Sequence, residues 1–158
     1  MILAGIYGIL HDQVTYSISP EYFTKFKYIQ FGFEPMWFGG DRQTVAVIGF
    51  LATWWTGLFI GTTIGLIALI FPDHISMRKA IIKAIKLTFL IAALFGFIGF
   101  LYGKFYLTKT GFDWWLPENL IDRNGFITVG SIHNFSYMGG AVGLLTSIIY
   151  LFVLKSRR

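Results

Sequence analysis

The chain has 158 residues, of which 55% are hydrophobic, 19% are aromatic and only 13% are charged. Soluble domains have roughly 25% charged residues, so this composition argues against a water-soluble globular protein and indicates an integral membrane protein. The formal net charge is +5, but the cations cluster beside apolar runs, where they set topology and meet anionic lipid head groups. Nucleic acid is therefore not an expected partner. The absence of cysteine excludes disulfides and cysteine-based metal sites.

The first apolar segment, residues 1–18, has neither the basic start nor the small-residue cleavage site of a signal peptide. A helix of this length measures about 27 Å, which is just enough to cross the hydrocarbon core of a bilayer. We therefore expect a transmembrane helix here. It places His11, Asp12 and Gln13 inside the span, where polar side chains are costly and usually functional.

The next segment predicts a short helix, because Ser19 can cap it, Pro20 fits its first turn and Glu21 favours the positive end of its dipole. Lys25 and Lys27 are interleaved with apolar side chains at helical spacing. This pattern is typical of an amphipathic helix that lies in the head-group plane. The apolar side chains are Tyr22, Phe23, Phe26, Ile29 and Phe33.

Three further apolar segments, 44–71, 84–106 and 130–154, predict three more transmembrane helices. The whole chain, residues 1–158, then forms one domain: an all-α, four-helix transmembrane bundle with a short interfacial amphipathic helix in the first outer loop. Glycines spaced four apart allow helices to approach closely, within the bundle or between copies of a homo-oligomer. These glycines are Gly57, Gly61, Gly65, Gly99, Gly103, Gly139 and Gly143.

Basic residues predict the orientation of the bundle. They concentrate in the linker 72–86 and in the terminal residues 155–158, which we expect on the cytoplasmic side. The longer loops, 19–43 and 107–129, carry nearly balanced charges and are expected to face outward. Both termini of this multi-pass protein then lie in the cytoplasm.

The amino-terminal stretch GIYGILHDQVT at residues 5–15, followed by ISPEYFT at 18–24, carries a recognisable pattern. It resembles a group of small bacterial integral membrane proteins marked by HDQ…SPEYF. The resemblance covers about the first 30 residues. It implies placement in the bacterial inner membrane and singles out four side chains: His11, Asp12, Gln13 and Glu21.

Two polar clusters are expected at a similar depth below the outer surface, one near the end of the first helix and one near the start of the last. Together they predict an outer-leaflet pocket formed by His11, Asp12, Glu21, His133 and Asn134. The candidate metal ligands are His11, Glu21 and His133, and the candidate ligand-binding residues are Asp12, Gln13, Asn134 and Ser136.

Two imidazoles and a carboxylate suit a divalent metal such as zinc, and an open coordination position would hold an activated water. No HExxH or HxH spacing is present, so the convergence of these ligands rests on the predicted topology. One alternative is that the histidines only hydrogen-bond across helices, with Asp12 pairing to Arg42, Arg123 or a histidine. Another is a bis-histidine haem between the first and last helices.

These observations leave three functions open. The pocket favours a metal- or ligand-binding membrane protein, such as a metal-assisted hydrolase of a lipid or envelope substrate. Glycine faces and aromatic loops would suit a non-catalytic accessory or assembly subunit of a membrane complex. A proton-coupled transporter or ion-conducting subunit would relay protons through His11, Asp12 and Glu21, but the inner halves of the predicted spans offer no matching polar path.

Overall fold

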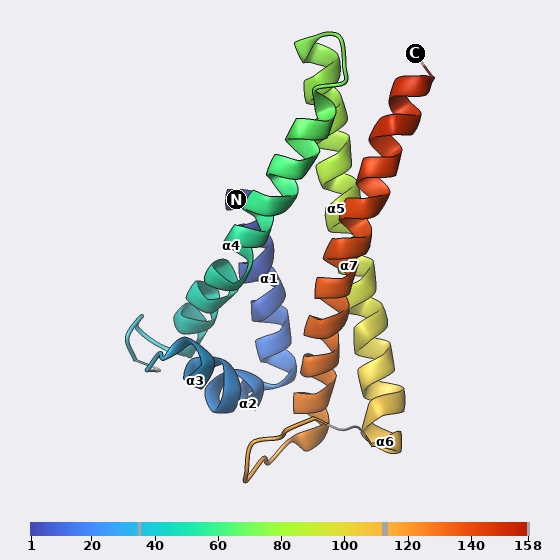
Figure 1. Ribbon diagram of the computed structural model, residues 1–158. Coiled ribbons are helices and arrows are strands. Elements are labelled where there is room, and N and C mark those ends of the chain that lie inside the picture. The colour runs from blue at the N-terminus through green and yellow to red at the C-terminus, as the bar shows by residue number, and fades with distance from the viewer. Residues whose placement is uncertain (35, 112–113, 158) are drawn as a thin grey trace.

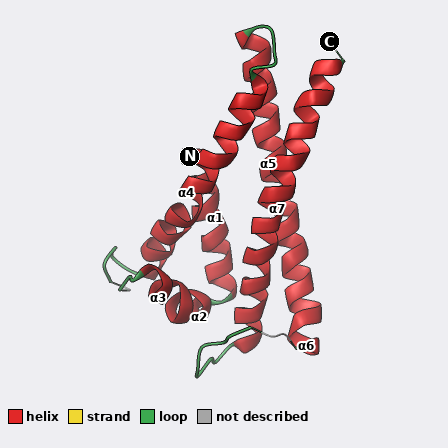
Figure 2. Ribbon diagram, in the orientation of Figure 1, coloured by secondary structure: helices red, strands yellow, loops and turns green. Residues whose placement is uncertain are grey.

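The computed structural model describes residues 1–34, 36–111 and 114–157, and all regular structure within them is helical (Figure 2). Three helices are long and apolar enough to cross a membrane: α4 (Asp41–Ala68), the run from α5 (His74–Tyr102) to Thr110, and α7 (Arg123–Ser156). The second of these runs includes the π-helical segment η2 (Gly103–Leu107) and the short helix α6 (Thr108–Thr110). The all-helical fold is therefore confirmed, and three of its helices are compatible with crossing a membrane.

The first helix, α1 (Ile2–Ile18), is shorter than these three. Its 17 residues correspond to about 26 Å, against a hydrocarbon core of about 30 Å. It runs antiparallel to α4 and begins near the middle of that helix (Figure 1), where the backbone nitrogen of Met1 lies 3.3 Å from the position of a Cβ at Gly57. The crossing of the membrane by α1, and with it a four-helix bundle, stays a prediction.

The helices pack as two antiparallel pairs (Figure 1). We call α1 with α4 the N-hairpin, and α5 with α7 the C-hairpin. Contacts within each hairpin are extensive, whereas contacts between the two hairpins are few. The hairpins meet at two apolar clusters, one near each end of the molecule. The first contains Tyr22, Phe23, Val45, Ile48 and Phe126, and the second contains Ile64, Ala68, Ala80, Ala84 and Leu151.

Two helices begin earlier than the apolar runs predicted, at His74 rather than residue 84 and at Arg123 rather than residue 130. In each case an aspartate caps the helix. Asp73 accepts a hydrogen bond from the backbone N–H of Ser76 at 2.9 Å, and Asp122 accepts one from Gly125 at 2.8 Å. The caps satisfy backbone donors, so the helices extend through polar sequence that hydropathy assigned to loops.

The segment after α1 departs from the predicted amphipathic helix. It consists of α2 (Pro20–Tyr22), the π-helical turn η1 (Phe23–Lys27) and α3 (Tyr28–Phe31). The wider π turn rotates the following residues relative to an α-helix, so Lys27 and Tyr28 are buried while Ile29 is 74% exposed. The structure therefore differs from the predicted interfacial helix, because Lys27 is buried instead of facing the lipid head groups.

Close packing of helices within the chain occurs at some of the predicted glycines but not at all of them. Gly99, Gly103, Gly139 and Gly143 lie against the opposite helix of the C-hairpin, and Gly57 lies against the start of α1. At Gly61 and Gly65, in contrast, a Cβ would meet nothing within 4 Å. The closest crossing of the N-hairpin is instead at Gly8 and Gly49, where the two backbones touch and no side chain fits.

Candidate metal centre

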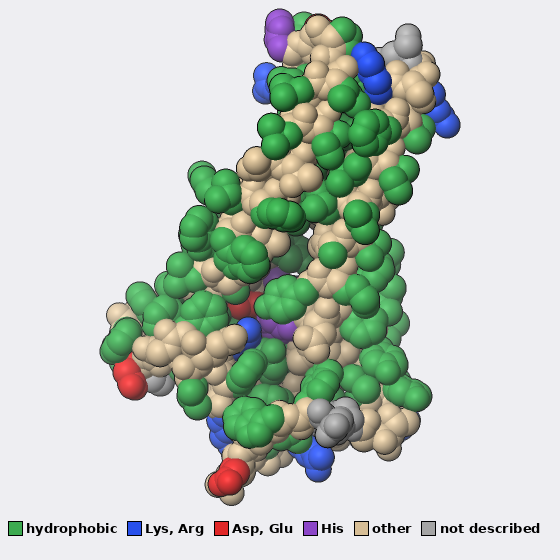
Figure 3. Space-filling model, viewed as in Figure 1, with side chains coloured by type: hydrophobic (Ala, Val, Ile, Leu, Met, Phe, Trp, Pro, Cys, Tyr) green, Lys and Arg blue, Asp and Glu red, His purple; other side chains and the backbone are tan. Residues whose placement is uncertain are grey.

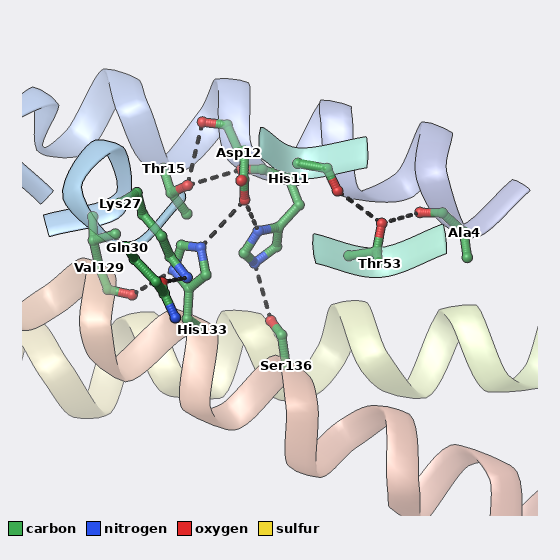
Figure 4. A network of polar contacts seen from close by, with 11 residues as sticks. Ala4, His11, Asp12, Thr15, Lys27, Gln30, Thr53, Val129, His133 and Ser136 are labelled. Carbon is green, nitrogen blue, oxygen red and sulfur yellow. Dashed lines mark hydrogen bonds and ion pairs between the residues drawn. The ribbon is translucent and has the colours of Figure 1, made fainter. Parts of the chain in front are cut away.

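His11 of α1 and His133 of α7 meet where the two hairpins face each other (Figure 4). Their ring centroids are 4.8 Å apart, and the rings stand edge to face. The space-filling view shows histidine and acidic atoms at the base of a hollow between apolar surfaces, with a Lys or Arg side chain beside them (Figure 3). The expected convergence of the two imidazoles is therefore present.

The carboxylate of Asp12 joins the two rings. Its Oδ1 atom lies 3.1 Å from Nδ1 of His11 and 3.2 Å from Nε2 of His133. Each residue offers one ligand atom, and these three atoms lie within 4.8 Å of one another. Asp12 and His133 are each only 4% exposed, so the group is shielded from bulk solvent. Two imidazoles and one carboxylate could hold a metal ion here.

The contact between His133 and Asp12 requires a proton or a metal ion between the ring nitrogen and the carboxylate oxygen. Nδ1 of His133 lies 3.0 Å from the backbone carbonyl oxygen of Val129. Because a carbonyl oxygen only accepts, Nδ1 carries a proton, and the neutral ring then presents the lone pair of Nε2 to Oδ1 of Asp12. Two acceptors 3.2 Å apart repel unless a proton or a metal ion lies between them.

The ring of His11 is held in a similar way. Its Nδ1 faces Asp12, and its Nε2 lies 3.1 Å from Oγ of Ser136 on α7. In metal sites a ligating histidine usually uses its other nitrogen for a hydrogen bond that fixes the ring. Both histidines have this arrangement, one through Val129 and one through Ser136. Ser136 was among the predicted ligand-binding residues and does lie at the site.

Lys27 was not predicted as part of the site. It is 5% exposed, and its Nζ donates to Oε1 of Gln30 at 3.1 Å. The same atom lies 6.0 Å from the ring centroid of Tyr22, and Tyr22 stacks on His133. Burial lowers the pKa of Lys27, and the Asp12 carboxylate partly opposes this shift. The π turn η1 carries Lys27 inward, and hydropathy gives no signal for such a turn.

Glu21, a predicted metal ligand, is not in the cluster. Its carboxylate oxygens accept hydrogen bonds from the backbone N–H groups of Ile121 at 3.0 Å and Asp122 at 2.6 Å, and it pairs with Lys25 at 2.6 Å. The hydrogen bond from Lys25 and then those from the two N–H groups lower the pKa of Glu21 to about 2. Glu21 thus fastens the loop before α7 to α2, and Asp12 supplies the carboxylate of the centre.

Two further predicted site residues lie elsewhere. Gln13 connects α1 to the start of α4, donating to the backbone carbonyl of Arg42 at 2.8 Å and accepting from the Arg42 guanidinium at 3.1 Å. Asn134 is exposed on α7, on a different side of the helix from the buried His133 and Ser136. Helix periodicity explains this separation, because consecutive residues point about 100° apart.

A bis-histidine haem does not fit this geometry. The porphyrin plane must lie between its two axial imidazoles. The rings of His11 and His133 are in edge contact, with Asp12 bridging them. There is no room for a macrocycle between them, so of the two predicted cofactors only a metal ion is compatible with the site.

A cleft of about 1030 Å³ opens from the centre between the two hairpins. Its lining includes the charged or titratable side chains of His11, Asp12, Lys27 and His133. Most of the remaining wall is apolar, as at Ile60, Phe89 and Leu144. Ligand pockets commonly combine an apolar wall with a few convergent polar groups, and this volume is at the upper end of the usual range. The cleft therefore suits a ligand with a small polar end and a long apolar part.

Comparisons with known proteins return no match to this chain, whether with family models, with curated proteins or with solved structures. The function must therefore be inferred from the geometry of the site itself.

Proposed function

We propose that this chain is a membrane protein whose His11, Asp12 and His133 bind a divalent transition metal such as zinc, which activates water to hydrolyse an ester in a membrane substrate. The observation that carries this proposal is the convergence of one nitrogen from each histidine on the same carboxylate oxygen. The second nitrogen of each ring is held by a different partner, Ser136 for His11 and Val129 for His133. A metal ion replaces the proton that the His133–Asp12 contact otherwise requires.

Three protein ligands with a further open position are the arrangement of catalytic rather than structural zinc sites. A metal held by these residues would lower the pKa of a bound water toward 7 and so supply hydroxide at neutral pH. In such a hydrolysis the water oxygen would bond to the ester carbon or phosphorus, the bond to the alcohol oxygen would break, and the proton released by the water would pass to that alcohol oxygen. The apolar cleft next to the centre favours a lipid-like substrate over a water-soluble one.

The orientation proposed for the chain puts the centre toward the outer face of a bacterial inner membrane. Arg78, Lys79 and Lys83 lie in the first turns of α5, and Lys155 lies in the last turn of α7. The start of α5 and the end of α7 lie at the same end of the molecule (Figure 1), where Figure 3 shows Lys or Arg side chains. The positive-inside rule assigns this end to the cytoplasm. The metal centre lies toward the other end, near α2 and η1.

The direct test is the metal content of the purified protein, measured by inductively coupled plasma mass spectrometry after dialysis against zinc. We expect about one zinc ion per chain, and its loss in His11→Ala and in His133→Ala. His74→Ala is the matched control, because His74 is the remaining histidine and begins α5 at the far end of the molecule. A wild-type protein without metal would remove this proposal and favour an accessory subunit, for which a stoichiometric partner should co-purify.

A second candidate function rests on one specific observation. Ser136, His11 and Asp12 are connected in the order of a serine hydrolase triad: Ser Oγ to His Nε2 at 3.1 Å, and His Nδ1 to the carboxylate at 3.1 Å. A fluorophosphonate probe separates the two chemistries. Labelling of Ser136 that persists in EDTA would favour the serine mechanism, whereas activity that EDTA abolishes and zinc restores would favour the metal mechanism.

A further inference from the structure

Lys27 is a buried cation whose charge no neighbouring carboxylate neutralises directly. Among the residues that the structure describes, no carboxylate oxygen forms an ion pair with its Nζ within 4.0 Å. One neutral amide, that of Gln30, accepts one hydrogen bond, and an ammonium group has three donors. The aromatic rings of Tyr22, Phe26 and Phe31 lie around the group, with their centroids 5.5–6.0 Å from Nζ. Lys27 is only 5% exposed, and burying an unpaired ammonium charge costs free energy unless an anion binds to it.

The side chain of Lys27 also faces the cleft. Lys27 lines the same cleft as His11, Asp12 and His133, and in Figure 4 its side chain points from η1 toward His133. An anion that contacts Lys27 from the cleft would therefore lie directly beside the candidate metal centre. With a divalent metal bound, the local charge is +2: a metal of +2, Lys27 of +1 and Asp12 of −1, with both histidines neutral. That charge balances the −2 charge of a phosphate monoester and exceeds the −1 charge of a phosphate diester by one unit.

The remainder of the cleft sets the other end of the ligand. Beyond the polar end, its wall consists mainly of apolar side chains from both hairpins, including Leu3, Ile60, Phe89 and Leu145. An inorganic anion would leave this apolar volume unfilled, whereas an alkyl chain would bury surface at about 25 cal/mol per Å². The cleft lies between helices apolar enough to span a membrane, which is where the chain of a lipid would reach it.

We propose that the site binds a phosphate-bearing lipid, with the phosphate between Lys27 and the His11–Asp12–His133 centre and an alkyl chain in the cleft between the hairpins. This inference rests on the proposed function and names the substrate class of that site. Lys27 is the head-group ligand, and its contact with the phosphate sets which ester bond lies against the metal.

The test is a ³¹P NMR titration of the zinc-loaded protein in dodecyl maltoside micelles, with dodecyl phosphate as the probe. We expect Lys27→Met to weaken dodecyl phosphate binding at least tenfold while the zinc content stays unchanged. Lys25→Met is the matched control, because Lys25 lies on the same π turn but pairs with Glu21 instead of lining the cleft. Its affinity should stay within twofold of wild type.

Inorganic phosphate tests the apolar half of the inference and should bind at least tenfold more weakly than dodecyl phosphate. Equal affinities would overturn the lipid assignment, and an unchanged affinity in Lys27→Met would overturn the role of Lys27. Lys27→Gln, checked by circular dichroism, replaces Lys27→Met if the latter does not fold. If the wild-type protein takes up no zinc but still binds dodecyl phosphate through Lys27, only the proposed metal centre is contradicted. If it binds zinc but not dodecyl phosphate, only the present inference is contradicted.

Discussion

The two hairpins hold their helices together in different ways. The C-hairpin is in contact along long helices, where Gly99, Gly139 and Gly143 let α5 and α7 approach and Thr88 and Ser147 hydrogen-bond between them. In the N-hairpin, the shorter α1 packs along α4, and the two backbones come closest at Gly8 and Gly49, beside which Thr53 donates to the backbone carbonyl of Ala4 at 2.8 Å. The C-hairpin thus joins two long helices, and the N-hairpin brings His11 and Asp12 to it.

This difference separates structural polar residues from those of the site. Thr88, Ser131 and Ser147 are buried, and each has its interhelical hydrogen bond within the C-hairpin. Ser136 is of the same residue type and lies on the same helix, but its partner is His11 of the N-hairpin. Ser136 is therefore assigned to the site, whereas Thr88, Ser131 and Ser147 are assigned to the packing of the C-hairpin.

The largest expected effect comes from disrupting the closest backbone contact of the N-hairpin. In Gly8→Ala the new Cβ would meet the backbone carbonyl of Gly49, which cannot rotate away. We expect a loss of about 1–3 kcal/mol in the free energy of unfolding, together with loss of bound zinc. Unfolding in SDS, followed by circular dichroism, measures the first effect. Gly61→Ala is the control, since its Cβ meets nothing within 4 Å. Equal stability of the two variants would show that the contact of Gly8 with Gly49 does not hold the N-hairpin together.

The next effect is on metal affinity and tests whether Ser136 acts across the hairpins. Ser136→Ala removes the partner of His11 Nε2, and we expect zinc affinity to fall about 10- to 100-fold, as for other residues that orient a ligating histidine. Competition with a chromophoric zinc chelator measures the affinity. Ser131→Ala should leave it unchanged, because Ser131 donates to the carbonyl of Gly99 within the C-hairpin. Equal losses in both variants would show a general packing effect instead.

A smaller effect is expected inside the C-hairpin. Thr88→Val keeps the shape of the side chain but removes its 2.8 Å hydrogen bond with Ser147. Interhelical hydrogen bonds of this kind contribute about 0.6 kcal/mol on average and about 1.7 at most. We expect a loss of stability in that range in SDS unfolding, with zinc affinity unchanged. Thr63→Val, whose hydroxyl donates only to Phe59 on its own helix, should change stability by less; a larger loss there would reverse the assignment.

The smallest effect concerns the tie between the hairpins at Glu21. Its folded-state pKa of about 2 lies below the usual 4.5, so its stabilisation is present above pH 4.5 and is lost as the pH falls through about 2. The Tm difference between wild type and Glu21→Gln should therefore be a few degrees at most at pH 6 and should shrink toward pH 2. Glu34→Gln, at an exposed position, should show no such trend. A difference that grows on acidification would contradict the assignment.

The helices themselves could be predicted from the sequence, because apolar run length is a local property that a bilayer selects directly. The predicted ends were less accurate at α5 and α7, where Asp73 and Asp122 start the helices within polar sequence. A capping side chain stabilises a helix by accepting hydrogen bonds from backbone N–H groups, so hydropathy does not reveal where such a helix begins. The orientation of the chain stays a prediction.

The site could be predicted only in part. His11 and His133 were expected at one depth because the rise per residue of a helix converts sequence position into depth. The choice of Asp12 over Glu21 as the carboxylate could not be predicted, since Glu21 is drawn to the N–H groups of Ile121 and Asp122 from a distant loop. The burial of Lys27 depends on a π turn that sequence periodicity does not reveal.

The sequence by itself determined that this is an all-helical chain with membrane-length apolar spans, and it determined the depth at which its polar residues lie. Both properties are one-dimensional, since they depend on local hydropathy and on a constant rise along each helix. Only the tertiary structure decided which polar groups meet. Lateral contact depends on how closely and at what angle helices cross, and here the backbone contact of Gly8 with Gly49 and the packing of the C-hairpin glycines bring His11 and Asp12 to His133.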